Sequence, residues 1–338
     1  MALHGCLLGT AVGDALGLPA EGMSAARIRR RWRGSWTMRL IFGRGMFSDD
    51  TEHTYAVAQS LAEHPGDEAA FQRSLAARLR WWFLALPAGI GMATAKACLK
   101  LWCGVSPQKS GVFSAGNGPA MRSAIIGIFF RDDEEKRREF VRASTRLTHT
   151  DPKAESAAQA VAAAAACAAN GGERDAFIAS LHTFSTESEW QLAMVRLRTH
   201  LAAYSSTRDY AQSLGLERGV SGYAFHTVPV ALYGWLRHPG DFAAALTSVL
   251  DCGGDSDTAG AVVGGIAGAG LGSDAIPSEW RDKLCDFPLS STKLAAAAQL
   301  LADGRKVPAL FWPARLLRNF IFLVIVLAHG FRRLLPPY

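Results

Sequence analysis

Residues 253–272 read GGDSDTAGAVVGGIAGAGLG, and within this stretch glycine recurs every four residues, at Gly260, Gly264, Gly268 and Gly272. The apolar spacing predicts a helix over 256–271, in which each interior glycine costs about 1 kcal/mol relative to alanine. That cost is offset where a neighbouring helix approaches the glycine backbone closely. The stretch is too short for a membrane span, so we expect it to lie at the crowded centre of a helical bundle.

The rest of the chain carries a helical pattern as well. Apolar residues recur at three- and four-residue spacing in most windows, and the alternating runs that mark strands are nearly absent. We therefore expect an all-α protein, a compact orthogonal helical bundle. The predicted helices cover roughly 3–16, 50–63, 68–84, 87–103, 117–129, 133–147, 152–169, 173–183, 187–203, 224–236, 239–250, 256–271, 290–302 and 314–331.

Composition excludes several classes of protein. With 338 residues, 49% hydrophobic and 20% charged, the chain is globular rather than disordered or fibrous. The net charge of +6 is small, so it argues weakly for acidic partners such as phosphates and against a dedicated nucleic-acid binder. Six cysteines without a C-x-x-C pair, and a start that lacks a signal-peptide pattern, predict a reduced cytoplasmic protein.

A basic segment lies near the N-terminus, where residues 27–39 hold six arginines interleaved with Trp32 and Trp36. Such a segment could contact nucleic acid or an acidic modified protein. Because one short patch is a small footprint, we prefer the interpretation that it is a solvated basic segment near the cleft.

The last 35 residues form a second unit in this interpretation, so we predict a domain over 1–303 and a basic and apolar helical tail over 304–338. Phe320–Ala328 is an uninterrupted apolar run between arginines, but 320–331 rises only about 18 Å as helix, so a span is not expected. An interfacial anchor at the inner membrane face, self-association and packing against the domain stay open, and we prefer packing. Truncation after Asp303 is expected to leave hydrolysis of a small substrate intact.

Two acidic motifs each open a predicted helix, Ser48-Asp49-Asp50-Thr51 and Gly253-Gly254-Asp255-Ser256-Asp257-Thr258. Taken singly, each is typical of helix capping. Taken together, two clusters of carboxylate and hydroxyl oxygens at helix starts can converge on one hard cation such as Mg²⁺. The candidate metal ligands are Ser48, Asp49, Asp50, Asp255, Asp257 and Thr258.

These motifs belong to an ordered set that resembles the ADP-ribosylglycohydrolase family, which includes the glycohydrolase that reactivates dinitrogenase reductase. The resemblance covers about residues 3–300 and implies an all-α fold whose central cleft holds two magnesium or manganese ions, with the six ligands above in the metal-binding positions. Ser48 stands where the family more often has threonine, which keeps the hydroxyl. The matching segments are 5–21, 48–51, 116–122, 148–149 and 254–258.

The resemblance also implies roles around the cleft. Glu21 would gate the site or assist proton transfer, and Asp50 is the second catalytic candidate. Ser114, Gly116, Asn117 and Gly118 would form a glycine-rich loop that presents N–H groups to a diphosphate. His149 would line the ADP-ribose pocket. Asp14, inside an apolar helix, needs a polar partner.

The expected activity is metal-dependent removal of ADP-ribose from a modified side chain, which makes the chain an ADP-ribosyl glycosidase. Cleavage at C1 of a ribose passes through an oxocarbenium-like transition state, so the site must fix the ribose, activate water and help the leaving group depart. Expected partners are an ADP-ribosylated protein or a small ADP-ribosyl substrate. A catalytically silent ADP-ribose-binding protein and a di-metal phosphohydrolase stay as alternatives.

Overall fold

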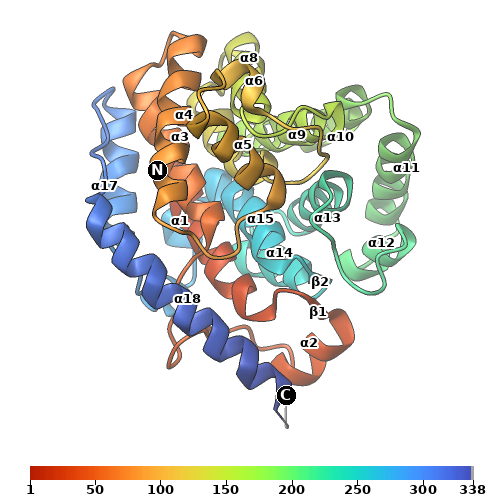
Figure 1. The fold of residues 1–338 in the computed structure, drawn as a ribbon. Helices are drawn as coiled ribbons and strands as arrows, with labels where there is room; N and C mark the ends of the chain where they lie inside the picture. The colour runs from red at the N-terminus through yellow and green to blue at the C-terminus, as the bar shows by residue number, and fades with distance from the viewer. Residues whose placement is uncertain (336–338) are drawn as a thin grey trace.

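The computed structural model describes residues 1–335 and confirms the all-α class, with only two strands of two residues each in this range. Figure 1 shows α1 and α15 in the middle of the molecule, with the other helices around them. The helices are α1 (Ala2–Gly17), α2 (Ala25–Trp32), α3 (Asp49–Glu63), α4 (Glu68–Leu84), α5 (Met92–Trp102), α6 (Pro107–Ser110), α7 (Ala124–Phe129), α8 (Glu134–Arg146), α9 (Pro152–Ala169), α10 (Arg174–Ser180), α11 (Ser188–Ala202), α12 (Thr207–Ser213), α13 (Ala224–Arg237), α14 (Phe242–Leu250), α15 (Ser256–Leu271), α16 (Ser278–Arg281), α17 (Ser291–Ala302) and α18 (Trp312–Leu334), with β1 (Met23–Ser24) and β2 (Gly253–Gly254).

The glycines of α15 pack against glycines of α1, as their spacing predicted. A Cβ atom added at Gly13 would lie 2.0 Å from the carbonyl oxygen of Gly260, and one added at Gly9 would lie 2.2 Å from that of Gly264. Both distances are too short for any side chain, so the two helices touch backbone to backbone. The antiparallel seam brings the end of α1 to the start of α15.

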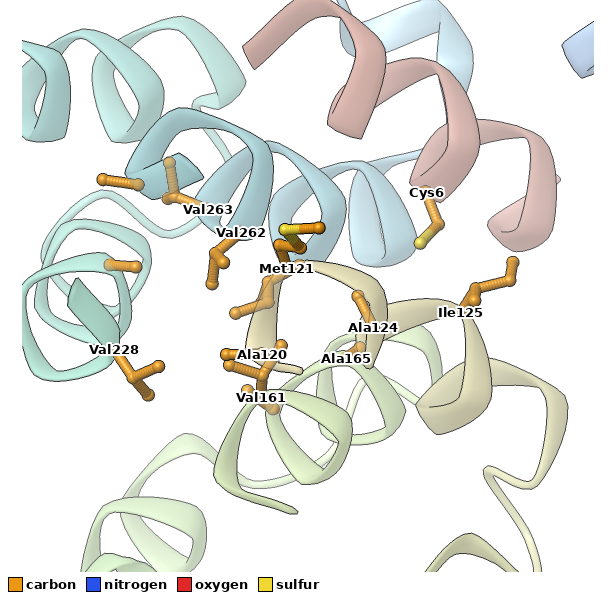
Figure 2. Close-up of a cluster of buried hydrophobic side chains, with 14 of the residues drawn as sticks. Cys6, Ala120, Met121, Ala124, Ile125, Val161, Ala165, Val228, Val262 and Val263 are labelled. Carbon is orange, nitrogen blue, oxygen red and sulfur yellow. The ribbon is translucent and has the colours of Figure 1, made fainter. Parts of the chain in front are cut away.

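The core continues from the seam through α7 and α9. Figure 2 shows Met121 and Ala124 between α15 and α9, whose Val161 and Ala165 face them, and all four side chains are buried. The alanine-rich sequence of α9 lets α7 approach so closely that a Cβ atom at Gly127 would lie 2.1 Å from the carbonyl oxygen of Ala162. Small side chains thus set the helix spacing around the centre.

Four short helices, α2, α6, α12 and α16, were not expected, and two predicted helices are shorter than expected. The helix predicted over 87–103 begins only at Met92, because Gly89 has a positive φ of 81° in the preceding loop. The helix predicted over 117–129 begins at Ala124, after a three-residue 3₁₀ turn, η2 (Ala120–Arg122). The residues before each true start therefore lie in loops.

The tail helix α18 is longer than the predicted 314–331 and has 23 residues, about 34 Å of helix. By length and composition alone it could cross a membrane, so the argument from the shorter run 320–331 is wrong for the complete helix. Only a small part of its most apolar window is buried. Figure 1 shows α18 along the outside of the molecule, from beside α17 to α2.

One face of α18 is anchored to the domain by buried polar contacts. Arg318 donates to both oxygens of Asp286, at 2.9 and 2.6 Å, and Asn319 donates to the carbonyl oxygen of Ala85 at 2.8 Å. Phe322 packs with Leu18 in a small apolar cluster. Truncation after Asp303 would remove the partner of a buried carboxylate, while the domain boundary at that residue stays a prediction.

Candidate active site

Three helix ends meet at one end of the α1–α15 seam, and Asp14 joins two of them. Its carboxylate accepts from the backbone N–H of Ser48 at 2.8 Å and from the N–H and hydroxyl of Thr51 at 3.1 and 2.7 Å. The hydroxyl of Ser256 donates to the carbonyl oxygen of Gly17 at 2.8 Å. Asp14 therefore has the polar partners that burial requires, and it fixes the start of α3 against α1.

Both acidic motifs face each other across this junction. Ser48 caps α3, since its hydroxyl oxygen accepts from the N–H of Asp50, and it also donates to Asp50 Oδ2 at 2.9 Å. The hydroxyl of Thr258 reaches the same Oδ2 at 3.4 Å. Asp255 precedes α15 without a side-chain cap, and its Oδ2 instead accepts from Asn117 Nδ2 at 2.7 Å. Capping explains Ser48 but not the carboxylate of Asp255.

The buried carboxylates of this junction repel one another. Burial, followed by the neighbouring negative charges, raises the pKa of Asp49 to about 8 and the pKa values of Asp50 and Asp257 well above the ordinary value. Burial also raises the pKa of Asp14 to about 7, against the hydrogen bonds it accepts. The arrangement thus gathers several acidic groups at one buried junction.

Two carboxylate oxygens in the junction, Asp50 Oδ1 and Asp257 Oδ1, are buried without a hydrogen-bond partner among the described residues. Buried carboxylate oxygens are normally paired or bound to a metal. The donor set of carboxylates and hydroxyls is the one that Mg²⁺ and Mn²⁺ prefer. Within residues 1–335, no three Asp, Glu, His or Cys side chains form a group that could hold a metal ion as they stand. The two unpartnered carboxylate oxygens and the chemistry of the surrounding donors are thus compatible with binding of a divalent cation.

A cavity of about 540 Å³ opens above the junction. Ser48 and Asp50 are not among its lining residues and are buried. The other predicted site residues all line it, namely Glu21, Asp49, Asp255, Asp257, Thr258, Ser114, Gly116, Asn117, Gly118 and His149. Sequence segments more than 200 residues apart thus share one cleft, while the role of each residue stays a prediction.

The strand pair β1–β2 places Glu21 beside Asp255. The N–H of Gly22 donates to the carbonyl oxygen of Gly254 at 2.7 Å, directly before the two strands pair. Gly254 has a positive φ of 85°, and a Cβ atom there would lie 1.9 Å from the carbonyl oxygen of Val220, so only glycine fits. Partial burial in the cleft, followed by the charge of Asp255, raises the pKa of Glu21.

The loop before η2 bonds two of its N–H groups within the chain. The backbone N–H of Gly116 donates to Ser114 Oγ at 3.3 Å, and that of Asn117 donates to the carbonyl oxygen of Gly222 at 2.9 Å. Neither is free for a diphosphate, and the loop leads into a 3₁₀ turn rather than a helix start. In this structure both N–H groups therefore have partners within the chain, and the role of the loop in binding a diphosphate stays a prediction. The small residues of the loop let a ligand come close to its backbone. The Asn117 side chain is fixed there, because its Nδ2 donates to Thr227 Oγ1 at 2.9 Å.

His149 lies under this loop. A Cβ atom at Gly116 would lie 3.0 Å from its Nε2, and one at Gly118 would lie 3.1 Å from its Cε1. Its Nδ1 lies 2.9 Å from Thr148 Oγ1. Burial, followed by the charge of Arg122, lowers the pKa of His149 to about 3, so the imidazole is neutral at physiological pH.

Arg122 belongs to the matching segment 116–122, but the sequence assigned it no role; the structure shows it as a fully buried cation next to the cleft. It donates to Thr148 Oγ1 at 2.8 Å and to the carbonyl oxygen of Ser144 at 2.7 Å. Burial lowers its pKa to about 10, which leaves it protonated at neutral pH. Arg122 thereby fixes the Thr148–His149 segment.

Two loops that line the cleft were also missed. Gly89, Gly91, Met92 and Thr94 come from the segment before and at the start of α5, and residues 220–222 come from the loop before α13. The glycines of residues 86–92 were a signal for the first loop, but the segment had been assigned to a helix. The second loop carries a similar signal, because residues 215–222 hold three glycines, but no motif assigned it to the cleft.

Comparisons with known proteins match this chain over most of its length. The family model described as ADP-ribosylglycohydrolase matches residues 2–309, which include both acidic motifs. The ADP-ribosyl-[dinitrogen reductase] glycohydrolase of Rhodospirillum rubrum is 28% identical over 291 residues, which cover 83% of this chain and 89% of that protein. The ADP-ribosylhydrolase ARH3 of Gallus gallus is 26% identical over 353 residues, which cover 86% and 91%.

A solved structure described as an ADP-ribosylglycohydrolase-related protein complex has the same fold. It matches with a TM-score of 0.63 and 25% sequence identity, and the match covers 90% of this chain and 97% of that chain.

Proposed function

The chain belongs to the ADP-ribosylglycohydrolase family and is an ADP-ribosyl hydrolase, and on that premise we propose that it uses two divalent cations, Mg²⁺ or Mn²⁺, to remove ADP-ribose from a modified protein side chain. The observation that carries the cation proposal is the pair of buried, unpartnered oxygens, Asp50 Oδ1 and Asp257 Oδ1. The cytoplasmic location expected from the sequence stays a prediction.

The residues that would hold the cations are the six oxygen donors Ser48, Asp49, Asp50, Asp255, Asp257 and Thr258. Bound divalent cations supply Lewis acidity toward ribose hydroxyls and water. The chain supports this by fixing the donors: Asp14 holds the start of α3, and Asn117 holds the carboxylate of Asp255. These donors are therefore positioned before a ligand arrives.

Glu21 is the proposed acid and base. Departure of the leaving group from C1 of the ribose needs a proton, and attack by water releases one. A carboxyl group with a raised pKa keeps its proton closer to neutral pH than an ordinary glutamate does, and Glu21 lies at the cleft wall with such a shift. Its backbone is held in place, since the N–H of Glu21 donates to the carbonyl oxygen of Leu18 and that of Gly22 donates to the carbonyl oxygen of Gly254.

The remaining wall would bind the ADP-ribose moiety. The cavity of about 540 Å³ lies within the range of roughly 300 to 1,000 Å³ that is usual for small-ligand sites. The neutral imidazole of His149 can donate or accept one hydrogen bond without adding charge. The glycines of the 116–118 loop let a ligand approach the backbone.

The test is mass spectrometry of an ADP-ribosylated peptide incubated with the full chain, with MgCl₂, with MnCl₂ and with EDTA. Metal-dependent release of ADP-ribose is the expected result. Binding of free ADP-ribose without release in any arm would indicate a silent binding protein. Release of AMP, which leaves ribose phosphate attached to the peptide, would indicate a phosphohydrolase that cleaves the diphosphate. A control for substitutions of the cleft aspartates is Asp274→Asn, since Asp274 is exposed and is not among the residues that line the cleft. This variant should release ADP-ribose like the unmodified chain.

A further inference from the structure

An apolar stripe runs along the outer face of α18. We define the α18 stripe as Leu317, Phe320, Val324, Leu327, Phe331 and Leu334. Their alternating three- and four-residue spacing places them on one face of the helix. Each is more than half exposed, between 52 and 79%. The stripe is too long and continuous to be a scatter of single surface residues.

The opposite face of α18 fixes which side looks outward. Arg318, Asn319 and Phe322 are buried against the domain, and Arg315 pairs with Glu52 at 3.6 Å. The helix cannot rotate to hide the stripe without breaking the Arg318–Asp286 pair. The stripe is therefore a fixed outward face of the folded chain.

Positive charge accompanies the stripe. Residues 304–338 contain six Lys and Arg residues and no Asp or Glu, which equals the whole net charge of +6, so residues 1–303 are neutral. At the far end of α18, the arginines of α2 lie beside those of the helix, and Arg27 Nη2 donates to the carbonyl oxygen of Arg333 at 2.9 Å. Burial, and to a smaller degree the charges of Arg333 and Arg31, lowers the pKa of His329. Arg315 and Arg318 are paired with carboxylates of the domain, so the charge beside the stripe comes from the two ends of the segment, at 305–306 and 332–333, and from α2.

We propose that the α18 stripe is a docking surface for a bilayer rich in anionic phospholipid, with α18 lying in the plane of the interface. Leucine and phenylalanine side chains on one face enter the boundary between headgroups and acyl chains. Arginines at the helix ends keep their guanidinium groups at the level of the lipid phosphates. The proposal is independent of the hydrolase activity.

Two other occupants fit the observations less well. A membrane span would place Arg318 and Asn319 in lipid and leave Asp286 buried without its cation, although the helix is long enough. A second copy paired in parallel along the stripe would bring the arginine pair 332–333 against its own counterpart, and no acidic residue follows Asp303 to balance that charge. An anionic bilayer is the partner that satisfies both the apolar face and the charge.

The test is flotation of the full chain with phosphatidylcholine vesicles and with phosphatidylcholine–phosphatidylglycerol vesicles, at low and high salt. We expect binding to the anionic vesicles only, weakened by salt. The double substitution Phe320→Ser and Leu327→Ser should weaken binding by at least about tenfold, because it removes two insertion side chains. Leu192→Ser with Val195→Ser, on an exposed part of α11, is the matched control and should bind like the unmodified chain.

Several results would overturn the proposal. The first is that the unmodified chain does not bind vesicles, and the second is that the stripe variant binds as well as the unmodified chain. The third is that alkaline carbonate does not release the bound chain, which would indicate a membrane span. Light scattering that shows a dimer dissolved by the stripe substitutions would assign the surface to a second copy. Unchanged thermal unfolding of the stripe variant confirms that the loss concerns binding and not the fold.

Discussion

Two buried groups of charge in this molecule are built in opposite ways. Asp286 is almost completely buried, and its oxygens accept from two nitrogens of Arg318 and from the N–H groups of Phe47 and Phe287. Asp50 and Asp257 are equally buried, yet each keeps one oxygen without a partner and each faces other carboxylates. The first group is complete within the chain and holds α18 in place. The second is incomplete within the described residues, as expected of a site that receives a ligand.

The largest effect is expected where the complete group is broken. Arg318→Met should lower the free energy of unfolding by about 3 to 5 kcal/mol, because it leaves the buried Asp286 carboxylate without its cation. Urea unfolding would measure the loss. The control Arg142→Met removes an exposed pair with Glu155 and should cost about 1 kcal/mol or less. Equal losses in both variants would show that burial does not distinguish the two pairs.

Substitutions in the incomplete group should lower turnover strongly and leave the free energy of unfolding unchanged, the reverse of what is expected for Arg318. Asp50→Asn and Asp257→Asn are each expected to lower turnover at least about 100-fold, about 2.7 kcal/mol of transition-state stabilisation. Neither should lower the free energy of unfolding of the metal-free chain, because each removes a repelled charge. Steady-state kinetics and urea unfolding measure the two quantities. A stability loss as large as that of Arg318→Met would show that these carboxylates are structural.

Divalent cations should bind the group that includes Asp50 and Asp257, and they should not bind at the Asp286–Arg318 pair. At about 100 times the dissociation constant, Mg²⁺ or Mn²⁺ should stabilise the fold by about 2.7 kcal/mol. For a chain of this length that is a rise in Tm of roughly 3 to 5 °C. Differential scanning fluorimetry would detect it, and Asp257→Asn should show a much smaller rise. A cation effect that survives in Asp257→Asn would place the binding elsewhere.

The stability of the metal-free chain should also depend on pH, through the buried Asp14 and, to a smaller degree, through Asp49, which borders the open cleft where water screens its charge. Burial raises the pKa of Asp14 from 3.8 to about 7 and that of Asp49 from 3.8 to about 8. Between about pH 4 and 8 the folded state therefore binds more protons than the unfolded state, and the stability of the metal-free chain falls as pH rises. Thermal unfolding in EDTA should show a Tm that declines from about pH 5 to about pH 8. Saturating Mg²⁺ should flatten that decline, and a metal-free Tm that rises with pH would contradict it.

Much of the fold was readable from local pattern. The helices at 152–169 and 256–271 were placed to within a residue, because periodicity and small residues dominate there. The helix α2 had a readable start, since Ser24 caps it and Ala25, Ile28 and Trp32 form its buried side. The density of arginines hid that pattern and favoured a solvated segment.

The candidate site was readable where its chemistry is concentrated in short motifs. The acidic pairs sit at helix starts, so their convergence could be proposed from spacing and resemblance together. The partners that depend on distant packing could not be proposed. The contact of Arg122 with Thr148 and the placement of Val220 against Gly254 are set by how whole helices pack. Arg318 stands beside an apolar run, where an arginine is expected to extend its charged end into water. Only the fold shows that it is buried and paired with Asp286.

The seam between α1 and α15 has a consequence for the order of folding. Gly13 and Gly260 touch through their backbones, although almost 250 residues separate them in the chain. Contacts of such long separation slow folding, because the loop between them must be closed before they stabilise anything. During synthesis, α1 leaves the ribosome without its partner and waits until α15 has been made. One acidic motif begins α15, and the other begins α3, which Asp14 of α1 holds in place. The cleft is therefore assembled late, and incomplete chains cannot display it.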